Sequence, residues 1–61
     1  MTCTVVKTGT YKQNGKDKNW MIISTDLKGF EVSGICNPKD LTAYEIGTEH
    51  EIPKEVIQFN Q

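Results

Sequence analysis

The chain has 61 residues, which suffices for one domain spanning residues 1–61 and leaves no room for a second core. Its net charge is −1, but the charged residues are distributed unevenly between the two halves of the chain. Residues 1–30 carry five lysines against two aspartates, whereas residues 31–61 carry two lysines against six acidic residues. The basic half is compatible with a surface that faces phosphates, while the acidic half argues against a protein that coats nucleic acid all round. Because every basic residue is lysine and guanine recognition favours arginine, sequence-specific recognition of duplex DNA is not expected.

Several classes of protein find no support in the sequence. No apolar leader or membrane-spanning run is present, so we expect a complete, cytoplasmic gene product with no membrane partner. Cys3 and Cys36 form no CxxC pair and His50 adds no zinc spacing, which predicts reduced, buried thiols and no metal or other cofactor. A bridge between the two cysteines stays open as an alternative. No nucleophile–base pair or phosphate-binding glycine loop occurs, so we predict no catalytic residues and no enzymatic activity.

The first half of the chain predicts two strands joined by a tight turn. Residues 2–12 are rich in threonine and valine and alternate between two faces, odd-numbered residues on one and even-numbered on the other, with Gly9 as the expected bulge or bend. The Asn-Gly dipeptide at 14–15 favours a tight hairpin because both residues tolerate a positive φ. Residues 19–26 contain the apolar run Trp-Met-Ile-Ile, which predicts a strand buried on both faces or one near the interior of a barrel.

The second half predicts a third strand, one short helix and two further strands. Residues 26–29 form an expected turn, and residues 30–36 alternate as a third strand that completes an antiparallel meander. Residues 38–44 are predicted to be helical, because Asn37 can cap a helix and Pro38 suits its first position.

Beyond that helix, residues 48–52 read as a fourth strand with His50 and Ile52 facing inward, ended by Pro53. A last short apolar strand is expected to contain Val56, Ile57 and Phe59.

This order predicts an all-β fold: a small five-stranded barrel or curved antiparallel sheet with one short helix between strands 3 and 4. An SH3-type barrel has a similar number of strands and is the open alternative. Gly9-Thr10-Tyr11 leads into Asn14-Gly15-Lys16 and then Trp20, the second strand is apolar, and residues 38–53 have a helix–Gly–strand rhythm. In these three places the chain resembles the small OB-fold single-stranded-DNA-binding proteins of phages and plasmids. The resemblance implies an OB fold, DNA binding, and the cytoplasm of a bacterium or of a phage-infected host cell.

The candidate site is the first hairpin, which carries the nucleic-acid-binding candidates Tyr11, Lys12, Lys16, Lys18 and Trp20. Lysines can hold phosphates and flat rings can stack on bases, which is how single strands are bound without sequence preference. The predicted function is therefore sequence-tolerant binding of single-stranded nucleic acid, with DNA as the expected polymer. A thin core and open sheet edges also predict a homodimer or higher oligomer.

The alternative is a small phage-encoded interaction module or inhibitor that docks on a host protein through an acidic surface or a sheet edge. The two functions differ in where the rings of Tyr11 and Trp20 lie. Rings exposed beside lysines favour nucleic-acid binding, and rings sealed in the core favour docking on a protein.

Overall fold

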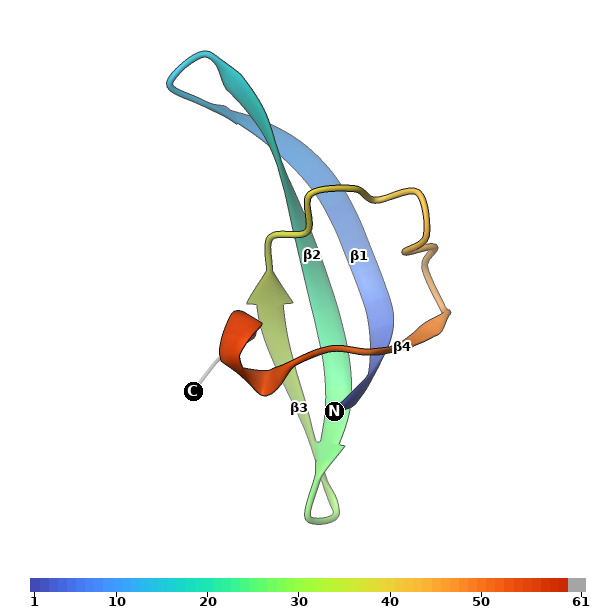
Figure 1. Cartoon of the computed structure of the whole chain (residues 1–61). Coiled ribbons are helices and arrows are strands. Elements are labelled where there is room, and N and C mark those ends of the chain that lie inside the picture. The colour runs from blue at the N-terminus through green and yellow to red at the C-terminus, as the bar shows by residue number, and fades with distance from the viewer. Residues whose placement is uncertain (60–61) are drawn as a thin grey trace.

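The structure is a computed structural model that describes residues 1–59, and it is an all-β fold, as predicted (Figure 1). One five-stranded antiparallel sheet curls into a half-barrel and has the order β4-β1-β2-β3-β5. The strands are β1 (Thr2–Gln13), β2 (Lys16–Leu27), β3 (Phe30–Cys36), β4 (Glu49–Glu51) and β5 (Gln58–Phe59). The first three form the predicted meander, and β4 returns beside β1, so strands 4-1-2-3 make a Greek key.

Both hairpins of the meander close through two-residue turns with positive φ. Asn14 and Gly15 have φ values of 53° and 76°, so the tight turn predicted from the Asn-Gly dipeptide is confirmed. Lys28 and Gly29 repeat this geometry between β2 and β3, with φ values of 53° and 86°. The backbone N–H of Gly29 donates to Asp26 Oδ1 at 2.9 Å, which supports the second turn.

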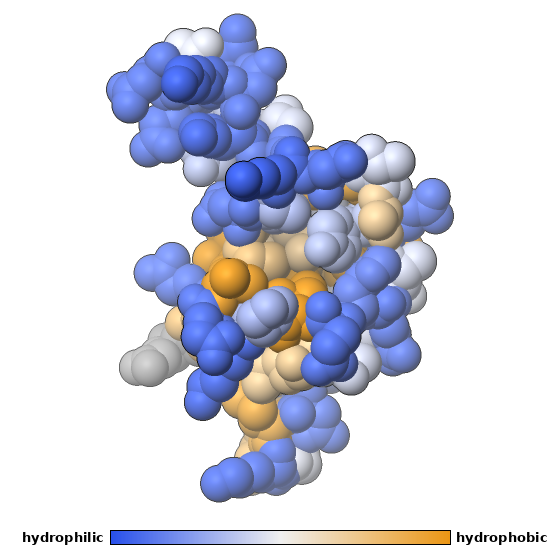
Figure 2. All heavy atoms as spheres, in the orientation of Figure 1, coloured by the Kyte–Doolittle hydropathy of each residue, from blue (hydrophilic) through white to orange (hydrophobic). Residues whose placement is uncertain are grey.

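The core lies on one side of the sheet, which we call the inner face. Its buried apolar members are Cys3, Val5, Met21, Ile23, Cys36, Ile52 and Ile57. Residues 37–59 cross this side, and the space-filling view shows apolar residues gathered at its middle while the free end of the β1–β2 hairpin is hydrophilic (Figures 1 and 2). We call the opposite side of the sheet the outer face. Both cysteines are free thiols, and burial, with a smaller contribution from Cys3, raises the pKa of the Cys36 thiol.

A β-bulge near the start of β1 changes which residues face the core. Val5 pairs with Ile23 in β2 but Lys7 pairs with Ile22, so Val6 is the extra residue. Odd-numbered residues therefore face inward up to Val5 and outward from Lys7 onward, and the single alternation predicted for residues 2–12 is wrong. The bulge predicted at Gly9 is also wrong, because Gly9 pairs regularly with Trp20.

The helix predicted for residues 38–44 is not present; in its place β3 and β4 are joined by an irregular segment with single turns. The backbone groups that would form the first turn of a helix are hydrogen-bonded to other partners. Asn19 Nδ2 donates to the carbonyl oxygens of Pro38 and Lys39, at 3.1 and 2.9 Å. The backbone N–H and hydroxyl of Thr42 both donate to Asp40 Oδ1, which closes a local turn and lowers the pKa of the Asp40 carboxyl. Among residues 1–59 the one helical element is a 3₁₀ turn, η1 (Lys54–Val56).

The predicted fourth and fifth strands are both present but shorter than expected. Ile52 and His50 point inward from the β4 segment, as predicted, with Ile52 buried and His50 half-buried. The His50 ring packs edge-on against Tyr44, with ring centroids 4.8 Å apart. Val56 belongs to η1 rather than to the last strand, and it is exposed. Within the described residues, no helix is long and apolar enough to cross a membrane.

Strand β4 is tied to the start of the chain by a charged contact at Glu51. The N-terminal amine lies 2.8 Å from Glu51 Oε1, and the Thr2 hydroxyl donates to Glu51 Oε2 at 2.9 Å. The hydrogen bond from the amine, followed by that from Thr2, lowers the pKa of the Glu51 carboxyl from its ordinary value of 4.5.

A carboxyl with a lowered pKa in the folded state stabilises the fold at pH values above its unfolded pKa. That stabilisation is lost as the pH falls through the folded pKa. We therefore expect Glu51→Gln to lower the denaturation midpoint at neutral pH and to make no difference near about pH 2. Urea denaturation at both pH values tests this, with Glu55→Gln as the control. A midpoint difference that is equal at both pH values would contradict it.

Candidate nucleic-acid interface

The register of the β1–β2 hairpin brings four of the five predicted site residues onto the outer face. Gly9 lies opposite Trp20, Tyr11 opposite Lys18, and Gln13 opposite Lys16. Met21 and Ile23 point into the core. Side chains alternate along a strand, so the even-numbered residues Lys18 and Trp20 point outward. Tyr11, Trp20, Lys16 and Lys18 thus form one continuous surface, which we call the ring–lysine surface.

Lys12 is the predicted site residue that this surface does not include. It lies between Tyr11 and Gln13 on β1 and pairs with Asp17 across the hairpin. Successive residues of a strand point to opposite faces, so Lys12 and Asp17 share the inner side of the hairpin. An aspartate beside Lys12 also offsets its positive charge, and we therefore leave Lys12 out of the interface.

Trp20 is positioned by a glycine on the neighbouring strand. A Cβ atom built on Gly9 would lie 2.4 Å from Cζ2 of the indole ring and 2.5 Å from Cε2, closer than van der Waals contact permits. The ring therefore lies directly over the backbone of β1 and is half-buried. The isolated glycine in the first predicted strand provides space for the ring, where the sequence had indicated a bulge.

We expect Gly9→Ala to displace the indole ring and to cost about 1–3 kcal/mol of stability, as overpacking does elsewhere. The emission maximum of Trp20 should shift with it, since the chain has a single tryptophan. Chemical denaturation of Gly9→Ala in the parent and in a Trp20→Leu background separates a clash with the indole ring from other effects of the added methyl group. A loss that is equal in both backgrounds would show that the glycine serves some purpose other than accommodating the ring.

The two aromatic rings border a shallow apolar hollow on the outer face. It is lined by Tyr11, Trp20, Ile22, Ile35 and Asn37, and has a volume of about 470 Å³. The Tyr11 side chain is 38 % exposed, and Trp20, Ile22 and Ile35 are half-buried. A half-exposed apolar hollow flanked by two rings can accept the flat face of a base.

A pair of asparagines holds the rim of this hollow in place. Asn37 Nδ2 donates to the backbone oxygen of Asn19 at 2.9 Å and approaches Tyr11 Oη at 3.5 Å. Asn19 in turn donates to the two carbonyls that follow Asn37. These bonds attach the β3–β4 connection to β2 next to Tyr11, where Lys39 joins Lys18 at the edge of a neighbouring polar hollow. Sequence reasoning assigned Asn37 to a helix cap and missed this role.

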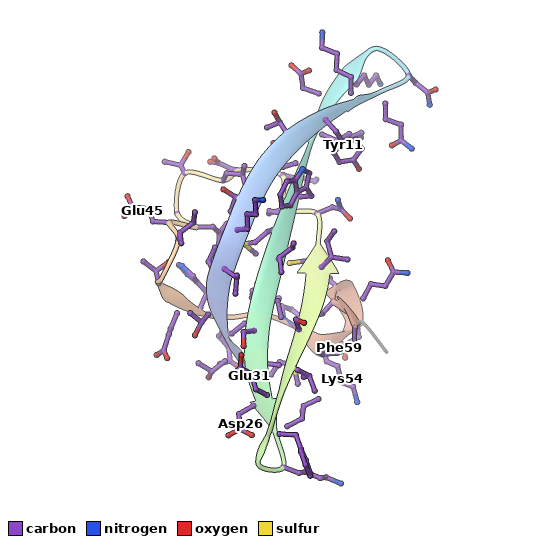
Figure 3. All side chains as sticks on the ribbon, turned by 180° about the vertical axis from the view of Figure 1, so that it is seen from behind. Tyr11, Asp26, Glu31, Glu45, Lys54 and Phe59 are labelled. Carbon is purple, nitrogen blue, oxygen red and sulfur yellow. The ribbon has the colours of Figure 1, made fainter. Side chains whose placement is uncertain are left out.

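Charge is separated along the outer face. Register and alternation place Lys16 and Lys18 toward the β1–β2 turn and Lys7 near the middle, opposite Ile22, whereas Asp26, Glu31, Glu49 and Glu51 lie toward the opposite end. Figure 3 shows this side, with Tyr11 near one end of the sheet and Asp26 and Glu31 near the other. Among the described residues, the one ion pair joins the N-terminal amine to Glu51, so the outer-face lysines form no ion pair within the chain. Their ammonium groups are available to an external anion.

Neither a metal-binding cluster nor a known relative indicates a function for this surface. No group of three or more His, Cys, Asp or Glu side chains in residues 1–59 is arranged to hold a metal ion. Comparisons of the chain with protein-family models, with curated proteins and with solved structures found no match. The ring–lysine surface is therefore interpreted from its own geometry and charge.

Proposed function

We propose that the protein is a sequence-tolerant binding module for single-stranded nucleic acid, with DNA as its polymer, and that it acts without catalysis. Lys16 and Lys18 contact phosphates, and Tyr11 and Trp20 stack on bases. In this proposal the half-barrel is OB-like. The Greek-key order of β4-β1-β2-β3 and the partly open, five-stranded sheet support that assignment.

The observation that carries the proposal is that both rings lie at the surface on the same face as two lysines that form no ion pair in the described chain. Rings sealed in the core would have favoured the alternative. Stacking contributes about 1–3 kcal/mol for each base. Two such contacts and two or three phosphate contacts correspond to roughly micromolar affinity at moderate salt.

The same face also limits how much nucleic acid can be bound. Phosphates placed beyond Ile22 would approach Asp26, Glu31 and Glu49, whose charges repel them. The bound strand is therefore confined to the half of the face that carries the rings. Lysine presents a point charge without the fork geometry that reads guanine, so binding depends little on base identity.

Fluorescence of Trp20 tests this proposal, because the chain has no other tryptophan. Titration with oligo(dT) at low salt is expected to quench the emission to a plateau, and added salt is expected to reverse the quenching. Lys12→Ala should leave the midpoint within about twofold, because Lys12 lies on the other side of the hairpin. Emission that does not change at tens of micromolar oligo(dT) would contradict the proposal.

Docking on a host protein is the second candidate function, and the β2–β3 hairpin tip favours it. Phe30 is 73 % exposed there and lies opposite Leu27, with Asp26 and Glu31 as the next pair. An exposed aromatic beside acidic residues suits a groove with a basic rim. Under this candidate, oligonucleotides do not bind, and host-protein binding is lost when Glu49→Lys and Glu51→Lys are combined.

A further inference from the structure

The outer face of β2 carries a charge and hydropathy pattern that is complementary to itself. Its outward residues, in chain order, are Lys16, Lys18, Trp20, Ile22, Ser24 and Asp26. Cations therefore lie at one end, apolar side chains at the middle and an anion at the other end. On β3, Ile35 lies beside Ile22 and Glu31 lies beside Asp26, so this strand repeats the apolar middle and the anionic end but carries no cation.

We propose that this face binds a second copy of the chain, with the two β2 strands antiparallel across a twofold axis close to Ile22. Counting outward from Ile22, Lys18 of each copy then lies opposite Asp26 of the other, and the two Ile22 side chains meet at the axis. A twofold axis uses the same patch on both copies, so each favourable contact occurs twice. In the parallel arrangement, Lys16, Lys18 and Asp26 would each face the same residue of the other copy, whereas in the antiparallel arrangement this holds, among the charged side chains, for Lys7 alone, beside Ile22 on β1.

The apolar middle of the face provides the attraction, and the charged ends determine the orientation. Trp20, Ile22 and Ile35 are half-buried in the single chain, and Val6 at the bulge is 48 % exposed. These side chains form an apolar strip over β2 and β3 that Val6 extends onto β1, where Lys7 lies beside Ile22 at its border. An apolar strip on the side away from the core is typical of a surface that associates. A chain of 61 residues gains proportionally more from such burial than a large one, because its own core is thin.

This association has a consequence for nucleic-acid binding, and that consequence rests on the proposed function. Asp26 and Glu31 of the second copy occupy the lysines that would otherwise hold phosphates. The second copy also covers Trp20, on which a base would stack. The dimer and the nucleic-acid complex therefore exclude each other, and a higher protein concentration weakens apparent binding.

A charge exchange between positions 18 and 26 tests the interface. Lys18→Glu alone and Asp26→Lys alone each turn two attractions per dimer into repulsions, and each should weaken dimerisation about 30-fold. The two changes together exchange the charges and should restore dimerisation to within about threefold of the parent. Positions 18 and 26 are eight residues apart on one strand, about 27 Å, so compensation within a single chain is excluded. Lys12→Glu, on the other face, is the control and should leave the dimer unchanged.

Sedimentation equilibrium without nucleic acid measures these constants, and circular dichroism confirms that each variant folds. A parent that stays monomeric up to about 1 mM would overturn the proposal. So would a dimer that the single changes leave intact, or one that the double change does not restore. Because no oligonucleotide is present, these outcomes are independent of the proposed function. A separate titration with oligo(dT) decides whether nucleic acid dissociates the dimer.

Discussion

Alanine at both Lys16 and Lys18 is expected to weaken binding to oligo(dT) about 25-fold at 0.1 M salt. Each phosphate contact with a single strand releases counterions equivalent to about 0.7 in the logarithmic salt slope, so losing two contacts lowers the slope by about 1.4. The loss should be similar for every sequence, since phosphates carry no base information. Fluorescence polarisation of labelled oligonucleotides over a range of salt concentrations measures both quantities.

The matched control removes the same charge from elsewhere on the molecule. Lys12→Ala combined with Lys54→Ala also deletes two lysines, one on the inner side of the hairpin and one on η1. If the ring–lysine surface is the site, this control should leave the salt slope within about 0.3 of the parent. Equal losses in the two double variants would mean that binding follows net charge and that there is no defined site.

Tyr11→Ala is expected to weaken oligo(dT) binding by about 1–3 kcal/mol, or about 5- to 150-fold, because one stacking platform is lost. The salt slope should not change, since no phosphate contact is removed. Tyr11 is a better probe than Trp20, because its ring is more exposed and is not packed onto Gly9. The contact of its hydroxyl with Asn37 is long, at 3.5 Å, so its loss should cost little stability.

Tyr11→Phe is the control for this change, because it keeps the ring and removes only the hydroxyl. It should bind within about twofold of the parent if stacking is the source of the affinity. Isothermal titration at one salt concentration, with thermal denaturation of each variant, distinguishes lost stacking from lost folding. Tyr11→Phe behaving like Tyr11→Ala would assign the effect to the hydroxyl and would contradict the stacking role.

Local signals in the sequence predicted the hairpins and the strands correctly. The Asn-Gly dipeptide has one strongly favoured conformation, and the apolar run from Trp20 to Ile23 favours a strand. Both features act over a few residues, and the structure retains them. Burial of that strand on both faces is not observed, because Trp20 and Ile22 on its outer face are only half-buried. Pairing between neighbouring strands follows once such tight turns are in place, so the meander was also predictable.

The faces of β1 were not predictable in the same way, because a bulge depends on the partner strand. The sequence did contain a signal, since Val6 and Lys7 interrupt the alternation where the extra residue lies. Gly9 also favoured a bulge, but it accommodates the indole ring of Trp20, eleven residues further along the hairpin. Without the bulge, Tyr11 would share the face of Val5 and would point toward the core.

The helix at 38–44 was predicted from capping preferences that tertiary contacts overrode. Asn37 and Asp40 have the right chemistry for the start of a helix, but their side chains bond to β2 and to Thr42. The acceptor groups of that first turn are taken by Asn19, which is distant in sequence. Long-range hydrogen bonds of this kind cannot be seen in a local pattern.

Titration of labelled oligo(dT) with the unmodified protein, followed by fluorescence polarisation at low and at moderate salt, is the direct test of single-strand binding. We expect saturable binding with roughly micromolar affinity that weakens as salt is raised, with a slope that reflects two or three phosphates. A polarisation signal that stays flat to tens of micromolar protein at low salt would contradict it, and would favour docking on a host protein.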